Sequence, residues 1–411
     1  MKIIVLAGGN DQAALIQELR HKFKDVEVLL IDFAPNVVAA KYADRHIVES
    51  TMDLAKVKEI AMQEKADYII TACGDQPLLT MAVVSEELGL PCYLSKKQVL
   101  NLTNKMYMKR LMVENDIPTS HFKTFTSVDV IDTTGLNYPL IVKPVDSNGS
   151  KGVRKCKDRA ELDKYLPEAF RFTLSDTIIV EEFCEGVEIS ADFYICDGKA
   201  KKVMWCQLNK YKVDDSTQVI YQSIIPPTLS EKASETLMQV ANKITKGYNV
   251  DNSPMLVQAI VNGDDVKVIE FSARLGGGAK YKTIQNVTGF NVLRANLESM
   301  LGEKPDVKIN NVGRYYSRCH IYTNGGVFTA IDGLEDLQER SIIDEYVLTK
   351  PFGVITGTPK SSSDRVASVF ISASSNEKLR EKINDAITNL KIINEKGEDM
   401  LFRGMYINDV I

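Results

Sequence analysis

A lysine followed by a glycine-rich loop stands before the middle of the chain. Residues 138–142 are mostly apolar and predict a β-strand, and Lys143 follows them. The loop after Lys143 contains small residues that leave the backbone free to turn: Ser147, Gly149, Ser150 and Gly152. Backbone N–H groups of such a loop can surround phosphate oxygens, and a lysine supplies positive charge. The segment therefore predicts a phosphate-binding loop, with a surface hairpin as the alternative, and it lacks the G-K-[ST] ending of a Walker loop.

Carboxylates gather at the end of the next predicted strand. Residues 178–180 are apolar. The segment after them contains five candidate binding residues, three of them acidic: Glu181, Glu182, Phe183, Cys184 and Glu188. Acidic groups that close a buried strand strengthen the interpretation of the glycine loop as part of a nucleotide site.

A predicted hairpin further along the chain carries oxygen ligands and an arginine. Glu270, Ser272 and Arg274 alternate, so their side chains are expected on one face of a strand. Gln258 lies on the partner strand, across a turn at Asn262-Gly263. A two-residue loop alone would put Gln258 and Glu270 on opposite faces, so the hairpin must be bulged or have a longer loop. The alternative is an edge hairpin with a solvated arginine.

A helix is predicted from about Thr103 to Glu114, with Thr103 as its N-terminal cap and Pro118 beyond its end. Lys105 then lies in the first turn. Asp75 follows another predicted strand at the start of a helix, where it is either a cap or faces a ligand.

These motifs, in this order over residues 1–310, resemble the ATP-grasp superfamily, and most of all its amino-acid ligases and the ligase halves of carbamoyl-phosphate synthetase. By this resemblance Lys105 and Lys143 hold the ATP phosphates. The segment of Glu181, Glu182, Phe183 and Cys184 holds adenine, with the Glu181 carboxylate and the Cys184 backbone at its amino edge. Glu188 is the implied ribose ligand.

The hairpin is similar to the E-x-N-x-R metal motif of the same family. The resemblance implies that Gln258, Glu270 and Ser272 hold Mg²⁺, with Mn²⁺ as an alternative ion, while Arg274 stabilises the transferring phosphoryl group. Ser272 replaces the usual asparagine, which puts a second metal ion in question. A further family cation on the strand after the first hairpin corresponds to Lys210 or to Lys212, and Lys210 is taken as the candidate.

The segments that position these residues predict an α/β and α+β multidomain protein. Residues 1–95 alternate strands and helices, which indicates a parallel sheet. By the resemblance this is the domain that precedes the ATP-grasp domain. Residues 96–310 form the ATP-grasp domain, with a glycine-loop lid at about 119–182, and residues 311–411 form a C-terminal α/β unit that closes the site or mediates homodimerisation.

The resemblance implies an ADP-forming ligase that activates a small carboxylate, such as an amino acid, as an acyl phosphate and transfers it to an amine. One alternative is an enzyme of the carbamoyl-phosphate synthetase type that uses bicarbonate and ammonia. Another is a nucleotide-binding regulatory protein without turnover, if Ser272 disables metal binding.

Composition excludes several other classes of function. A net charge of -5 does not favour nucleic acid as a partner, and no apolar run reaches the length that spans a bilayer. The seven cysteines include no C-x-x-C pair, which argues against a zinc ribbon or a disulfide framework. The N-terminus lacks the pattern of a secretory signal, so a cytoplasmic location is expected.

Overall fold

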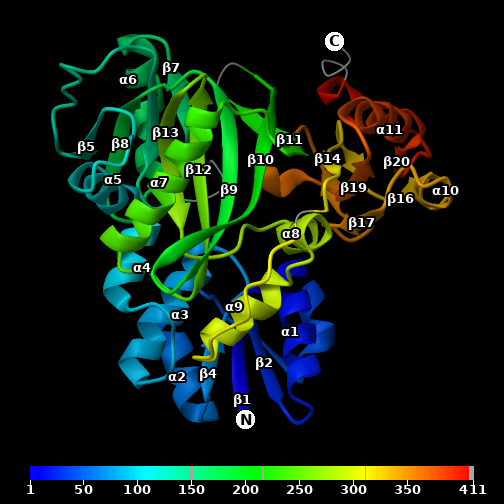
Figure 1. Ribbon diagram of the computed structural model, residues 1–411, viewed down its shortest axis with the longest axis horizontal. Coiled ribbons are helices and arrows are strands. Elements are labelled where there is room, and N and C mark those ends of the chain that lie inside the picture. The colour runs from blue at the N-terminus through cyan, green and yellow to red at the C-terminus, as the bar shows by residue number, and fades with distance from the viewer. Residues whose placement is uncertain (148–151, 215–216, 311, 407–411) are drawn as a thin grey trace.

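The structure is a computed structural model that describes residues 1–147, 152–214, 217–310 and 312–406. It confirms the predicted fold class: a parallel sheet at the N-terminus, a mixed α/β body and a C-terminal α/β unit (Figure 1). None of the helices in these described ranges combines the length and the apolar composition needed to cross a bilayer.

The N-terminal sheet is parallel and has the strand order β3-β2-β1-β4. Its elements follow the predicted alternation: β1 (Lys2–Leu6), α1 (Asn10–Lys22), β2 (Glu27–Asp32), β3 (Arg45–Val48), α2 (Leu54–Glu64), β4 (Tyr68–Ile70) and α3 (Asp75–Leu88). The apolar runs of β1 and β2 are buried because helices cover the sheet.

Two helices lead from this sheet into the body, whereas the sequence predicted a single helix from about Thr103 to Glu114. Helix α4 (Lys96–Thr103) ends just before α5 (Lys105–Glu114) begins. The prediction of Thr103 as the cap is wrong, because its hydroxyl donates back to the Val99 carbonyl at 2.8 Å. Asn104 caps α5 instead, with its side-chain oxygen accepting from the Met106 N–H at 3.0 Å.

A four-stranded sheet with the order β5-β8-β6-β7 carries the predicted lid residues. Its elements are β5 (Phe122–Thr126), β6 (Leu140–Pro144), β7 (Arg154–Cys156), α6 (Arg159–Phe172) and β8 (Thr177–Glu182). Helix α6 continues through Pro167, and Ala169 beyond the proline is buried in the core of this unit.

The body is an eight-stranded antiparallel sheet with the order β13-β12-β9-β10-β11-β14-β19-β17. The strands are β9 (Val187–Cys196), β10 (Lys199–Lys212), β11 (Gln218–Ile225), β12 (Ser253–Asn262), β13 (Asp265–Ser272), β14 (Tyr315–Ile321), β17 (Glu345–Leu348) and β19 (Ala367–Ala373). Strands of the C-terminal unit therefore extend the sheet that contains the predicted metal hairpin (Figure 1).

Helices and short strands complete these units: α7 (Glu231–Gly247), α8 (Lys280–Thr288), α9 (Val292–Met300), β15 (Gly326–Val327), β16 (Ala330–Asp332), α10 (Leu334–Glu339), β18 (Ile355–Thr356), α11 (Asn376–Asn389) and β20 (Lys391–Ile393).

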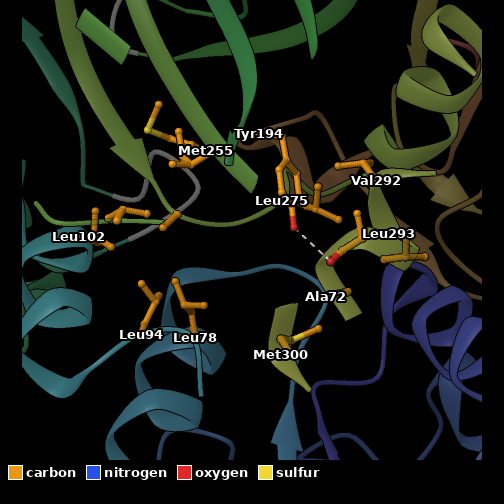
Figure 2. Packing of buried hydrophobic residues seen from close by; sticks show 14 of the residues in the cluster. Ala72, Leu78, Leu94, Leu102, Tyr194, Met255, Leu275, Val292, Leu293 and Met300 are labelled. Carbon is orange, nitrogen blue, oxygen red and sulfur yellow. Dashed lines mark hydrogen bonds between the residues drawn. The ribbon is translucent and has the colours of Figure 1, made fainter. Parts of the chain in front are cut away.

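One hydrophobic core joins the N-terminal sheet to the body. Ala72 and Leu78 of the N-terminal unit belong to the same buried cluster as Met255 and Leu275 of the body (Figure 2). Tyr194 lies in this cluster and its hydroxyl donates to the Ala295 carbonyl at 3.2 Å. Burial of such side chains contributes about 1.5 to 3 kcal/mol each, which holds the two units in one fixed arrangement. The lid and the C-terminal unit have cores of their own.

Candidate active site

The hairpin of β12 and β13 contains the predicted bulge. Its loop has only two residues, because Asn262 pairs with Asp265, but the register shifts between Gln258 and Ala259. Gln258 consequently pairs directly with Glu270, so both side chains lie on one face. The prediction that a minimal hairpin must be bulged is confirmed.

A small cavity of about 20 Å³ opens on this face of the hairpin. Seven polar residues from four separate segments line it: Asp75, Thr103, Lys105, Gln258, Glu270, Ser272 and Arg274. The cavity can hold a water molecule or an ion but is far too small for a nucleotide. A bound nucleotide would therefore lie outside this cavity.

Lys105 joins this cavity to the glycine loop. It is the first residue of α5 and its ammonium donates to the Ser147 carbonyl at 2.7 Å. Burial lowers the pKa of Lys105, while Glu270 opposes that effect. Gly152 closes the loop with φ +71, and a Cβ there would lie 3.0 Å from Pro144 Cγ. Gly149 and Ser150, both predicted phosphate ligands, lie outside the described residues.

Lys143 forms a buried ion pair with Glu181 from the neighbouring strand β8. Glu181 also accepts from the ammonium of Lys109 at 2.7 Å and from the Ser120 hydroxyl at 2.8 Å. Burial alone would raise the pKa of Glu181, but the two lysines outweigh it and hold the pKa well below its usual range. Glu181 is therefore an anion that fixes two ammonium groups beside the glycine loop.

Lys109 is a site residue that the sequence analysis missed. Its side chain is only 1% exposed, and burial lowers its pKa while Glu181 opposes the shift. It lies four residues after Lys105 on α5, so both lysines occupy one face of the helix. That i, i+4 spacing was a signal that could have identified it.

The remaining residues of the predicted adenine segment directly follow Glu181 in the chain. The carboxylate of Glu182 accepts from the Asn137 side chain at 2.8 Å. The ammonium of Lys155 lies 3.5 Å from the centre of the Phe183 ring, a cation–π contact. Cys184 is half-buried, with burial raising the pKa of its thiol.

Glu188 connects the predicted ribose and metal groups. Its buried carboxylate forms an ion pair with Lys210 and accepts from the Gln258 amide at 3.1 Å. Lys210, one of the two lysines between which the sequence could not choose, thus reaches the face that carries the metal candidates.

Arg274 is held by a carboxylate that the sequence analysis did not pair with it. Its Nε and Nη2 donate to the two oxygens of Asp75 at 2.6 and 2.7 Å. The Ser272 hydroxyl donates to the same carboxylate at 2.9 Å. Burial would raise the pKa of Asp75, but Arg274 lowers it, so both groups remain charged. Ser272 is thereby turned toward Asp75.

The donor set fits one hard cation. Glu270 is half-buried and forms no hydrogen bond or ion pair with any described residue, while Gln258 faces it across the hairpin. The described residues contain no cluster of three or more His, Cys, Asp or Glu side chains that could enclose a metal. Mg²⁺ commonly binds to one or two carboxylates and completes its shell with substrate phosphates and water.

Comparison with known proteins identifies this arrangement. A family model described as the ATP-grasp domain matches residues 136–282, from β6 to the start of α8. This part of the chain is an ATP-grasp domain. The match includes the glycine loop, the adenine segment and the hairpin motif through Arg274.

Ligases are among the proteins to which this chain is similar. Phosphoribosylamine–glycine ligase of Thermococcus kodakarensis is 24% identical over 67% of this chain and 68% of its own length. D-alanine–D-alanine ligase of Pediococcus pentosaceus is 30% identical over 41% of this chain and 48% of its own. The multifunctional protein ura1 of Schizosaccharomyces pombe is 23% identical over 70% of this chain, which spans only 13% of that protein.

Solved structures share this fold over nearly the whole chain. The L-amino acid ligase from Bacillus licheniformis superimposes with a TM-score of 0.79, at 21% identity, over 96% of this chain and 98% of its own. Phosphoribosylglycinamide synthetase from Anaerococcus prevotii has a TM-score of 0.74, at 18% identity, over 96% and 99%.

Proposed function

We propose that this chain is an ADP-forming carboxylate–amine ligase that acts on an amino acid or a similar small carboxylate. The observation that carries the proposal is the unpaired carboxylate of Glu270, which faces Gln258 and shares a cavity with Lys105 and Arg274. One carboxylate among cationic and neutral groups could bind the metal ion of a metal–ATP complex, while the cations bind its phosphates. The site therefore has the composition needed for phosphoryl transfer.

The reaction has two balanced steps. A carboxylate oxygen of the first substrate attacks the terminal phosphorus of ATP, the bond to the bridging oxygen breaks, and ADP leaves. The nitrogen of an amine then attacks the acyl carbon, the C–O bond to phosphate breaks, and the amine loses a proton. Both steps require positioning and charge neutralisation more than a protein nucleophile.

The residues divide this work between them. Lys105 and Lys143 neutralise phosphate oxygens, with Lys143 oriented by Glu181. Arg274 is oriented by Asp75 so that the rest of its planar face can meet the transferring group. A magnesium ion held by Gln258 and Glu270 supplies further charge neutralisation when bound. The lid sheet around the glycine loop keeps water from the acyl phosphate.

The substrate class is inferred from the similar proteins. Phosphoribosylamine–glycine ligase, D-alanine–D-alanine ligase and L-amino acid ligase are all named for amino acids. An experiment that tests the proposal measures ADP release with pairs of amino acids and the mass of the product. Amino-acid-dependent ADP release and a product formed with loss of water are expected. No ADP release with any carboxylate and amine would contradict a ligase activity.

Bicarbonate as the carboxylate substrate is the second candidate. One structural neighbour, with a TM-score of 0.74 at 15% identity, is a biotin carboxylase domain in complex with MgADP and bicarbonate. An ATPase activity that requires bicarbonate and is unaffected by amino acids would favour this candidate.

A further inference from the structure

Two arginines of the C-terminal unit flank a glycine that follows the active-site motif. Arg318 on β14 donates from Nη1 to the Gly278 carbonyl at 2.8 Å. Arg365, just before β19, is also close, since a Cβ at Gly278 would lie 2.9 Å from its Nη1. Gly278 lies four residues after Arg274, with φ +75. The glycine loop at 276–278 therefore connects the phosphoryl-transfer site to both guanidinium groups.

Neither guanidinium is neutralised by an ion pair with a carboxylate of the described residues. Two acids that act electrostatically on Arg318 have closer partners: Asp192 lies 2.6 Å from the Lys280 ammonium, and Asp11 accepts from the Gly278 and Ala279 N–H groups at 3.1 and 2.9 Å. Burial and the neighbouring Arg365 lower the pKa of Arg318 to about 10. Two like charges close together, one of them buried, are unfavourable unless an anion joins them.

A histidine beside the pair stays neutral and does not supply the missing charge. Nη1 of Arg365 lies 3.3 Å from Nδ1 of His320, which is itself 2.9 Å from the Ser368 hydroxyl. Burial and then the two arginines lower the pKa of His320 far below its usual range. The cluster thus keeps the charge of both guanidinium groups.

Two buried donors at the cluster have no acceptor among the described residues. They are Nε of Arg318, whose side chain is more than nine-tenths buried, and the hydroxyl of Ser223 on β11. Ser223 and Arg318 are paired directly across β11 and β14, so their side chains project from the same face as neighbours. Buried donors are normally satisfied, so a shared acceptor is expected between them.

This face of the sheet is the one that carries the active site. Ser223 pairs with Leu208 on β10, and Leu208 pairs with Glu188 on β9. Residues paired across strands share a face, and Glu188 holds the Gln258 amide. One row of side chains therefore runs from Glu188 to Arg318 across four strands that lie side by side in Figure 1.

We propose that Arg318, Arg365 and Ser223 form a subsite that binds an oxyanion, a carboxylate or a phosphate, carried by the amine substrate. A planar guanidinium matches either group with two parallel hydrogen bonds, and the serine hydroxyl adds a third donor. We assign the held oxyanion to the amine rather than to the reacting carboxylate, because Arg318 contacts Gly278, four residues beyond Arg274. The proposal rests on the proposed ligase function and assigns the specificity for the amine.

Matched amines test the subsite against the catalytic site. We would compare L-alanine with L-alaninamide, and O-phosphoethanolamine with ethanolamine, using the carboxylate found in the amino-acid panel. The wild type should prefer the charged member of one pair, which identifies the oxyanion as carboxylate or phosphate. Arg365→Ala should raise KM for that charged amine about tenfold or more, with little change for its neutral partner. Ser223→Ala should have the same selective effect, but smaller.

Hydroxylamine separates this proposal from the proposed function. It is a small neutral amine that traps an acyl phosphate as a hydroxamate, so Arg365→Ala should form hydroxamate at the wild-type rate. Arg380→Gln, an exposed substitution on α11, is the matched control and should alter neither reaction. A wild type that forms hydroxamate while Arg365→Ala loses activity equally with charged and neutral amines would overturn the subsite.

Direct binding decides the proposal even if no ligase activity is found. Calorimetric titration of inorganic phosphate and of acetate into the wild type should detect binding of at least one anion, and Arg365→Ala should lose it. Equal anion binding by both proteins would exclude the subsite. So would a wild type that neither binds an anion in the titration nor prefers the charged amine in the comparison.

Discussion

At the scale of single residues, the site is organised by carboxylates that fix cations. Glu181 holds Lys143 and Lys109 in buried ion pairs, and Asp75 holds Arg274 in a partly buried pair. A buried charge that loses its partner is costly, so these pairs fix the ammonium and guanidinium groups before a substrate arrives. Glu270 has no hydrogen-bond or ion-pair partner among the described residues. Under the proposed function, this open carboxylate is the group that would meet the metal ion of a metal–nucleotide complex.

Replacing Lys143 and Lys105 tests the proposal that this site binds a nucleotide. Lys143→Ala and Lys105→Ala should each lower ATP affinity about tenfold or more, because a hydrogen bond to a charged phosphate oxygen contributes roughly 1.5 to 3 kcal/mol. Binding would be measured by calorimetry with Mg²⁺ present. Lys123→Ala, an outer lid lysine paired with Asp132, is the control and should bind as the wild type does. Unchanged affinity in both active-site variants, with the fold intact, would remove the assignment.

Replacing Arg274 tests its role in phosphoryl transfer. A lysine cannot donate to both oxygens of Asp75 and still face the phosphoryl group, so Arg274→Lys should lower kcat at least about tenfold. ATP binding should change much less. Arg294→Lys, an exposed replacement on α9 beside Glu298, provides the comparison. Near-normal turnover in Arg274→Lys would show that this arginine serves only as a counter-ion for Asp75.

At the scale of elements, the β12–β13 hairpin and strand β14 show how local irregularity and sheet extension place functional groups. One extra residue in β13 turns Gln258 and Glu270 to a common face. Strand β14 pairs with β11 and so carries Arg318 and His320 into the sheet of the active site. The His320 side chain is buried there between Ser368 and Arg365.

The buried histidine on β14 predicts a dependence of stability on pH. Because the pKa of His320 is lowered in the folded state, the unfolded chain binds a proton below about pH 6.5 that the folded chain does not, and stability falls as the pH drops. Between pH 7.5 and 5.5 this group should cost about 1.4 kcal/mol of unfolding free energy. Urea unfolding of His320→Gln at both pH values should show that this part of the pH dependence is lost.

The matched control for this pH effect is His21→Gln on the exposed side of α1. It should follow the pH dependence of the wild type. A wild type and a His320→Gln variant whose stabilities fall in parallel with pH would contradict a neutral buried His320.

At the scale of the whole molecule, the C-terminal unit is structurally continuous with the body. Val219 and Tyr221 of β11 are buried in the C-terminal core, and Tyr221 packs edge-to-face on Tyr406 with ring centres 5.5 Å apart. The N-terminal unit shares its core with the body in the same way. Each unit therefore contributes to the stability of its neighbour.

Removing the C-terminal unit tests this continuity. A chain that ends at residue 312 would leave the β11 edge unpaired and expose Val219 and Tyr221, so it should be largely insoluble. The measurement is the soluble fraction on expression, followed by circular dichroism. A chain that ends at residue 406 keeps the described contacts and should remain soluble. A soluble, ATP-binding chain of 312 residues would show that the C-terminal unit is an independent domain.

The sequence by itself determined the elements and the chemical class of the site. Periodicity marked the N-terminal α/β alternation, and residue parity required either a bulge or a longer loop in the hairpin. These are local properties, because strand faces, turns and caps depend on residues close together in the chain. One local prediction was still wrong: α4 extends through Thr103, so Asn104 is the N-terminal cap of α5.

Only the tertiary structure decided which charges meet. Asp75 and Arg274 are 199 positions apart, and Lys105 meets the Ser147 carbonyl from another unit. Arg318 joins the active-site face only because β14 pairs with β11. Sequence patterns specify which way a side chain projects from its own element, but the partner of a buried charge depends on how separate elements pack. The ion pairs and the arginine cluster were therefore set by long-range packing, whose register no local pattern records.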